Sequence, residues 1–194
     1  MLKAESMHEN TSESDLIAAG REGDRSAFEE LFRRNQRRVY SVAFNFFGGD
    51  RQLAEDISQQ VFLKLYVGIA KFRGDAQVST WLYRVTVNQC IDEQKKRNRF
   101  SFFGDIFERE DSEVVEIDDS TEERLEISES VKKAVAELKP IFRAPLVLKH
   151  VEGLSYSEMA QVLDISEGTV ASRLSRGHKM LAESLRHLQV SGNQ

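Results

Sequence analysis

Apolar residues recur at spacings of three and four along most of this chain, which is the period of an amphipathic helix. The clearest stripe contains Leu53, Ile57, Val61 and Leu65, each four residues after the last. No stretch competes with this pattern by alternating apolar and polar residues, as a half-buried strand would. The pattern therefore predicts an all-α protein.

The helical period stops in the middle of the chain, and this divides the sequence into two small helical domains. We expect the first domain at residues 15–99 and the second at residues 122–188. The segment between them, 100–121, has no helical period, begins with several phenylalanines and then becomes acidic. We interpret it as a flexible linker, and we expect polar, disordered tails at 1–14 and 189–194.

Charge is distributed unevenly and supports the two-domain prediction. The formal net charge is −5, yet residues 105–126 alone contain eleven acidic side chains against two basic ones. The flanking domains are therefore close to neutral or mildly basic. Charge asymmetry of this kind indicates two working modules joined by an acidic connector.

Composition excludes several classes of protein. No apolar run approaches a membrane span, and the N-terminus is too polar for a signal peptide, so we expect a cytoplasmic protein without membrane insertion. The single cysteine, Cys90, excludes an intramolecular disulfide and a cysteine-based zinc site within the chain.

Residues 155–181 have the pattern of a helix-turn-helix. Ser155 and Glu158 form a capping box for a short first helix, and a turn at Asp164 leads into a second helix from Glu167. In this motif the second helix lies in the major groove of DNA. Its outer face carries Thr169, Ser172, Arg173, Arg176 and Lys179.

These residue types suit contact with DNA. Arg173 or Arg176 can pair with the O6 and N7 atoms of guanine, while Thr169 and Ser172 suit phosphates or thymine methyl groups. Lys179 is better placed for the DNA backbone. The alternative interpretation is an ordinary amphipathic hairpin with a solvated basic face.

A second candidate surface lies in the first domain, in the segment STWLYRVTVNQ. We expect Ser79 or Thr80 to cap its helix. Trp81 and Tyr83 are candidates to stack on bases or wedge between them, and Asn88 offers a donor and an acceptor to a base edge. The equally open alternative is that Trp81 is a core residue.

The order of these motifs resembles the extracytoplasmic-function (ECF) sigma factors of bacterial RNA polymerase. The resemblance is carried by AEDISQQVFLKLY, then FRGDAQVSTWLYRVTVNQCID, then the acidic linker, then VEGLSYSEMAQVLDISEGTVASRLSRG. It extends from about Asp15 to about Leu185. In that family two helical domains, regions 2 and 4, bind core polymerase and read two promoter elements.

The resemblance implies a role for each matching position. The helix Ala54 to Tyr66 would dock on the clamp helices of the largest polymerase subunit, with Asp56, Gln59 and Phe62 exposed or half-exposed. The second domain would meet the flap region, and the linker would follow the path of nascent RNA. The implied polymerase-binding residues are Asp56, Gln59, Gln60, Phe62 and Leu63.

The resemblance also divides the promoter between the two domains. The stretch 79–96 would read the upstream edge of the melted minus-ten element, with Asn88 at the pocket for a flipped base. The helix from Glu167 would read the minus-thirty-five element. The implied minus-ten residues are Trp81, Tyr83, Arg84 and Asn88, with Lys95, Lys96 and Arg97 on nearby phosphates.

The resemblance also implies how the protein is regulated, because an anti-sigma factor clamps many family members until a stress or envelope signal arrives.

Three positions depart from the family pattern. Ala171 stands where Lys or Arg is common, Gln60 replaces a common Glu, and Asp164 replaces a turn glycine. Asp tolerates the left-handed conformation that such a turn requires.

Other classes of function fit the sequence less well. A stand-alone helix-turn-helix regulator would explain residues 122–185 but would leave the first domain without a role. For an enzyme, the histidines lie in separate segments, and Cys90 inside a helix reads as a small buried apolar residue. We therefore expect no catalysis, no cofactor and no metal site.

Overall fold

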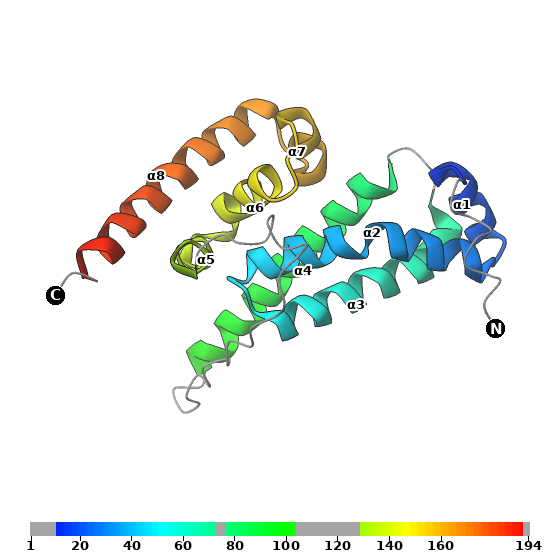
Figure 1. The fold of residues 1–194 in the computed structure, drawn as a ribbon, viewed down its shortest axis with the longest axis horizontal. Helices are drawn as coiled ribbons and strands as arrows, with labels where there is room; N and C mark the ends of the chain where they lie inside the picture. The colour runs from blue at the N-terminus through cyan, green and yellow to red at the C-terminus, as the bar shows by residue number, and fades with distance from the viewer. Residues whose placement is uncertain (1–10, 73–76, 104–128, 192–194) are drawn as a thin grey trace, which may run out of the picture.

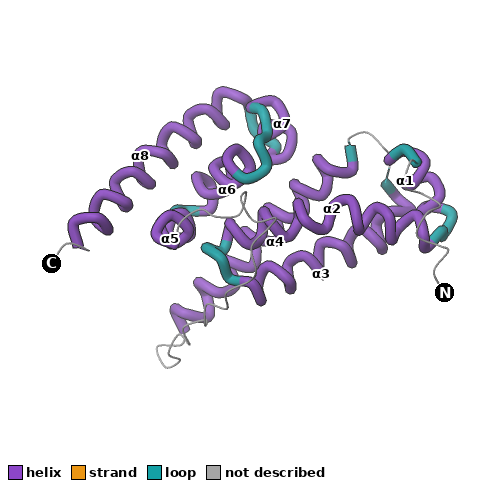
Figure 2. The backbone as a smooth tube through the Cα atoms, in the orientation of Figure 1, coloured by secondary structure: helices purple, strands orange, loops and turns teal. Residues whose placement is uncertain are grey.

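The structure is a computed structural model that describes residues 11–72, 77–103 and 129–191. Every regular element in these ranges is helical, and no strand occurs in them (Figures 1 and 2). The prediction of an all-α protein is confirmed. Most of the predicted linker lies outside the described residues.

Three long helices make up most of the first domain. They are α2 (Arg25–Phe46), α3 (Arg51–Gly68) and α4 (Val78–Phe103), and the short α1 (Glu13–Arg21) packs near the start of α2. A single 3-10 turn, η1 (Ile69–Lys71), follows α3. The turn between α2 and α3 contains two glycines with positive φ, and the Asp50 side chain then caps α3 by accepting from the Leu53 amide.

The second domain contains α5 (Glu129–Glu137), α6 (Pro140–His150), α7 (Tyr156–Leu163) and α8 (Glu167–Ser191). Both hydrogen bonds of the predicted capping box between Ser155 and Glu158 are present. Asp164 ends α7 in the left-handed conformation, with φ 54° and ψ 51°. The helix-turn-helix predicted here is therefore confirmed as a fold.

Local signals placed one helix start incorrectly. Neither Ser79 nor Thr80 caps α4, because the helix already begins at Val78. The Val78 amide donates instead to Glu13 Oε1 at 2.9 Å, so a side chain of α1 caps α4. The first described helix begins at Glu13, capped by Ser12, and α4 runs on to Phe103, four residues past the expected boundary.

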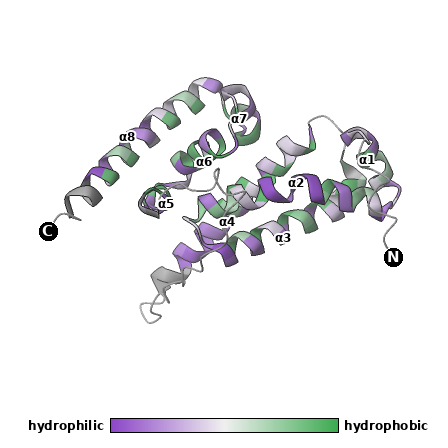
Figure 3. Ribbon diagram, in the orientation of Figure 1, coloured by the Kyte–Doolittle hydropathy of each residue, from purple (hydrophilic) through white to green (hydrophobic). Residues whose placement is uncertain are grey.

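Apolar side chains form the core where the helices face one another. Figure 3 shows that apolar and polar residues alternate along the helices, so that most helices have a face of each kind. The predicted α3 stripe is buried throughout or nearly so, and Cys90 is completely buried, as expected. In the second domain, Gly177 lets α8 approach α6, since a Cβ there would lie 2.9 Å from the Leu146 side chain.

Candidate nucleic-acid interface

The helix-turn-helix holds α8 so that one of its faces is free. Val170 and Leu174 are buried against the neighbouring helices, and the Ser166 hydroxyl accepts from the Thr169 amide at the start of α8. Residues at spacings of three and four from Thr169 therefore share the opposite face. These are the five residues predicted from the sequence, Thr169, Ser172, Arg173, Arg176 and Lys179.

The hydroxyls and cations on this face differ in their local bonding. Thr169 Oγ1 lies 2.9 Å from Ser166 Oγ, and Ser172 Oγ donates to the Thr169 carbonyl at 3.0 Å. Within the described ranges no ion pair holds Arg173, Arg176 or Lys179. The cations are therefore available to a polyanion, whereas the Thr169 hydroxyl already pairs with a side-chain hydroxyl and the Ser172 hydroxyl with a backbone carbonyl.

A second polar face runs along α4. Trp81, Arg84, Asn88 and Lys95 follow one another at spacings of three, four and seven, so they lie along one side of the helix. Asn88 and Lys95 are exposed, and Trp81 is half-buried with its ring edge-on to Phe72, centroid to centroid 6.2 Å. Trp81 therefore packs partly within the first domain, and part of its ring is open to solvent. Contact of this ring with a base stays a prediction.

Tyr83 does not belong to that face. Its side chain is buried, and its hydroxyl donates to Glu152 Oε2 of the second domain at 2.7 Å. Burial, and then the Glu152 carboxylate, raise the pKa of Tyr83 far above its ordinary value. The neighbouring Arg84 donates to the Gln161 carbonyl of α7 at 2.5 Å. Two predicted minus-ten residues are therefore bonded to the second domain in this structure.

The basic run near the end of α4 is exposed and weakly paired. Lys95 and Lys96 each lie 3.4–3.5 Å from an acidic residue three positions earlier, and Arg97 lies 3.5 Å from Asp50. Exposed pairs of this kind contribute about 0–1 kcal/mol. DNA phosphates can therefore replace these carboxylates as partners of the cations with little loss of free energy.

On α3, the predicted polymerase-binding residues are only partly exposed. Asp56, Gln59 and Leu63 are open to solvent. Phe62 is not: it is 5% exposed and packs edge-on to Phe32 at 4.6 Å, so the expectation of an exposed Phe62 is wrong. Its position one residue after Val61 places it at the margin of the buried stripe.

Gln60 is held by a hydrogen-bond chain between α3 and α4. The Gln89 amide donates to Gln60 Oε1, and Lys64 donates to Gln89 Oε1. The residue that departs from the family pattern at this position therefore bonds within the first domain.

Part of the exposed apolar surface of α3 was not predicted from the sequence. Leu63 is 62% exposed, and Tyr66 and Val67 beside it are 59% and 71% exposed. Large apolar side chains that gather on a surface commonly mark an interaction site. Val67 is apolar but does not belong to the buried stripe Leu53, Ile57, Val61 and Leu65. This position was the signal in the sequence that could have identified it as an exposed apolar residue.

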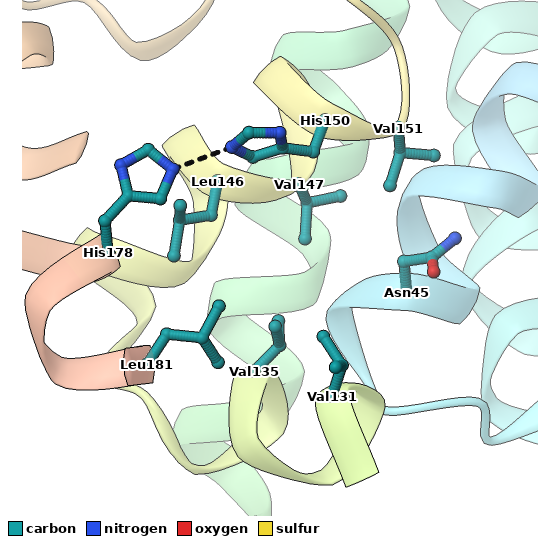
Figure 4. Close-up of a pocket in the computed structure, with 9 residues that line it drawn as sticks. All are labelled: Asn45, Val131, Val135, Leu146, Val147, His150, Val151, His178 and Leu181. Atoms are coloured by element: carbon teal, nitrogen blue, oxygen red, sulfur yellow. Dashed lines mark hydrogen bonds between the residues drawn. The ribbon is translucent and has the colours of Figure 1, made fainter. Parts of the chain in front are cut away.

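The structure brings together two histidines that the sequence places 28 residues apart. His150 Nε2 and His178 Nε2 lie 2.7 Å from each other, between α6 and α8 (Figure 4). Their separation along the chain gave no sign of this pairing. The pair borders a cavity of about 300 Å³ that is lined mainly by valines and leucines.

Neither the histidines nor Cys90 form a larger chemical cluster. Among the described residues there is no group of three or more His, Cys, Asp or Glu side chains that could hold a metal ion. Burial raises the pKa of the Cys90 thiol, which disfavours the reactive thiolate. No helix in the described ranges is long and apolar enough to cross a membrane.

The histidine pair predicts a pH-dependent stability. Burial, the His178 ring and the Lys149 ammonium lower the pKa of His150 from its ordinary value of 6.5. The unfolded chain therefore binds this proton more readily, and the free energy of unfolding should fall as the pH drops through 6.5 towards the lower folded pKa. Urea denaturation between pH 8 and pH 5 measures the effect. His178→Gln should flatten the slope relative to His8→Gln, and identical slopes would contradict the prediction.

Two family profiles match the chain. Sigma-70 region 2 matches residues 31–100, and Sigma-70 region 4 matches residues 128–181. The ECF RNA polymerase sigma factor SigM of Mycobacterium tuberculosis is 33% identical over 184 residues, covering 94% of this chain and 89% of that protein. The RNA polymerase sigma-H factor of Pseudomonas aeruginosa is 32% identical over 92% of this chain and 97% of that protein.

Solved structures share the fold. The sigma factor RpoE in complex with the anti-sigma factor NepR from Bartonella quintana gives a TM-score of 0.65 at 24% identity, over 82% of this chain and 96% of that chain. CnrH in complex with the cytosolic domain of CnrY gives 0.64 at 21% identity, over 90% and 97%. Because relatives above 30% identity match both chains over most of their length, this protein belongs to the extracytoplasmic-function family of RNA polymerase sigma factors.

Proposed function

We propose that this chain directs core RNA polymerase to its promoters through three surfaces of its own. The observation that carries the proposal is that two helices of different domains, α4 and α8, each present exposed polar and cationic residues at helical spacing. The first domain also has an exposed apolar strip on α3, formed by Leu63, Tyr66 and Val67. A stand-alone DNA-binding protein would have no use for that strip.

The minus-thirty-five element would be read by α8. Arg173 and Arg176 are the candidates for guanine, with Lys179 on the backbone and Thr169 and Ser172 at phosphates or methyl groups. Because Ala171 is uncharged, Arg173, Arg176 and Lys179 supply the cationic character of this face.

The minus-ten element would be read by α4. Asn88 would meet the flipped base, Trp81 and Arg84 would flank it, and the basic run at 95–97 would hold phosphates. Tyr83 shares the helix but not the face, so its assignment requires the second domain to release its hydroxyl from Glu152.

Core polymerase would bind the exposed side of α3. Asp56, Gln59, Gln60 and Leu63 belong to this proposal, and we add Tyr66 and Val67 because both are large, apolar and exposed. Phe62 would act from beneath by supporting this surface. The second domain would meet the flap region of the polymerase. We also propose the domain bounds 15–99 and 122–188, with the acidic linker between the two domains.

We further infer that the chain is non-catalytic and works in the cytoplasm with the polymerase. An anti-sigma factor would hold it inactive until a stress or envelope signal. Support comes from the two solved relatives, one determined with the anti-sigma factor NepR and the other with the cytosolic domain of CnrY.

Transcription in vitro tests the proposal. Purified chain and core polymerase are combined with genomic promoter fragments, and transcripts are compared with those made by core alone. We expect new transcripts with defined start sites and co-elution of the chain with core. A chain that shifts promoter DNA alone, does not co-elute and adds no transcripts would be a stand-alone regulator.

Asn88→Ala separates minus-ten reading from polymerase binding. Loss of the exposed amide should slow open-complex formation by about 5- to 150-fold, the equivalent of about 1–3 kcal/mol for one base contact. Affinity for core should stay within about twofold of wild type, because Asn88 belongs to α4, whereas the proposed polymerase-binding residues belong to α3. Permanganate footprinting measures melting, and Gln36→Ala is the exposed control on α2. Equal loss of core affinity would mean that Asn88 has another role.

A further inference from the structure

The cavity beside the histidine pair has polar groups only at two opposite ends. Its volume is about 300 Å³, and it lies between α2, α5, α6 and α8. Valines and leucines form its walls, and among the described side chains that line it only Asn45, His150 and His178 are polar. Figure 4 shows the two histidines on one side of the cavity and Asn45 on the other. A molecule that fills the cavity therefore meets polar groups at its two ends and aliphatic groups between them.

Asn45 provides an unpaired acceptor at the inner end. Its side chain is 3% exposed, and its Nδ2 donates to the Ser41 carbonyl at 2.9 Å. No described residue donates to its Oδ1. Because the amide nitrogen is bonded to the backbone of its own helix, the oxygen is the atom that this side chain can offer to the cavity. Buried acceptors seldom stay unpaired in folded proteins, so this oxygen indicates a partner from outside the chain.

Water alone is a poor partner for this oxygen. A buried water makes about three hydrogen bonds to polar groups of the protein. Asn45, however, is the only described polar side chain at its end of the cavity. One polar atom between aliphatic walls suits a donor that is attached to an apolar body.

The histidine pair forms the outer end of the cavity. Both side chains are exposed, and their Nε2 atoms lie 2.7 Å apart, so that one ring donates to the other. The accepting ring can instead carry its proton on Nε2, and both rings then offer an N–H to one shared acceptor. Lys149 precedes His150 in the last turn of α6 and adds a positive charge. This end therefore suits a carboxylate that enters from solvent.

The volume and the walls restrict the body of the ligand. A cavity of about 150 Å³ accepts benzene, so one of about twice that volume holds about eight to twelve carbon atoms. No described Phe, Tyr or Trp lines the cavity, and so it has no ring on which an aromatic ligand could stack. An aliphatic chain fits this environment better than an aromatic ring.

We propose that the cavity binds a medium-chain aliphatic carboxylic acid with a hydroxyl group at its far end. His150 and His178 hold the carboxylate, and the hydroxyl donates to Asn45 Oδ1. None of the residues that line the cavity belongs to those proposed above for promoter DNA or core polymerase. The site therefore goes beyond the proposed role in transcription, and either proposal can fail without the other.

Isothermal titration calorimetry of the full chain with three probes tests both ends of the site. The probes are 10-hydroxydecanoate, decanoate, which lacks the hydroxyl, and 1,10-decanediol, which lacks the carboxylate. We expect the hydroxy acid to bind at one site per chain, about threefold or more tightly than decanoate. It should also bind about tenfold more tightly than the diol. This comparison uses the wild type alone, so it does not depend on the folding of any variant.

Two variants assign the ends of the ligand to their residues. Asn45→Leu should remove the preference for the hydroxy acid over decanoate. Asn35→Leu is its matched control, because Asn35 is also 3% exposed on α2 and donates to a carbonyl four residues earlier, but does not line the cavity. His178→Phe keeps a flat ring and should weaken both acids about fivefold or more, with the diol within about twofold. Met180→Phe, at an exposed position of α8 outside the cavity lining, is the control for the added ring.

Leu181→Trp adds a bulky ring to the cavity wall and should abolish binding of all three probes. Binding that survives this change would place the probes elsewhere and overturn the site. Equal affinity of the wild type for the three probes, or no binding at millimolar concentration, would overturn it as well. If Asn35→Leu and Asn45→Leu lose the hydroxyl preference alike, the assignment of the inner end to Asn45 is wrong.

Discussion

Replacing Arg143 with methionine is expected to lower the free energy of unfolding by about 3–5 kcal/mol. The guanidinium donates to the carbonyls of Ala136 and Leu138 at the end of α5 and to that of Phe46 at the end of α2. Terminal carbonyls of a helix have no partner within the helix. Methionine fills similar space but leaves these buried acceptors unpaired.

The charge of Arg143 is tolerated because of where it lies. Burial lowers its pKa to about 10, so it stays protonated at neutral pH. No carboxylate of the described residues pairs with it. The guanidinium is stabilised instead by the negative ends of the α2 and α5 helix dipoles. Arg143→Lys keeps the charge but cannot donate to several carbonyls at once, so it should lose less stability than methionine and more than a surface substitution.

Urea denaturation followed by circular dichroism measures this loss, with Trp81 fluorescence as a separate report on the first domain. Arg21→Met, an exposed arginine on α1, is the matched control and should change stability by less than about 0.5 kcal/mol. If Arg143→Met loses less than about 1 kcal/mol, the carbonyls have other partners and the arginine is not structural.

Features that depend on neighbouring residues were predictable from the sequence. The capping box at Ser155, the left-handed Asp164 and the buried stripe of α3 follow from spacing and from intrinsic backbone preference. The exposed face of α8 follows in the same way, because Val170 and Leu174 are buried on the opposite side of the helix.

Features that depend on distant residues were not predictable. Tyr83 meets Glu152 across 69 residues, and Arg143 meets the Phe46 carbonyl across 97. His150 meets His178 across 28. Helical periodicity shows which side of a helix is buried, but it does not show which other helix covers that side. For this reason the interface between the domains could not be predicted from the sequence. It is this interface that pairs Tyr83 and Arg84 with residues of the second domain.

Arg176→Ala is expected to weaken recognition of the minus-thirty-five element by about 1–3 kcal/mol and to relax specificity at one base pair. Arg176 is exposed, lies seven residues after Thr169 on the same face of α8, and has no ion pair with a described residue. Its guanidinium can therefore approach a guanine edge in the bidentate geometry that distinguishes this base.

Lys179→Ala provides the contrast that identifies a base contact. Lys179 lies three residues further along the helix, where a flexible ammonium suits a phosphate. Its loss should weaken all promoter sequences alike and reduce the slope of log affinity against log salt by about 1. Both variants are measured as holoenzyme with core polymerase, on a promoter set in which each base pair of the element is changed in turn. If Arg176→Ala weakens every sequence equally, Arg176 binds the backbone, and Arg173 becomes the remaining arginine of this face for base recognition.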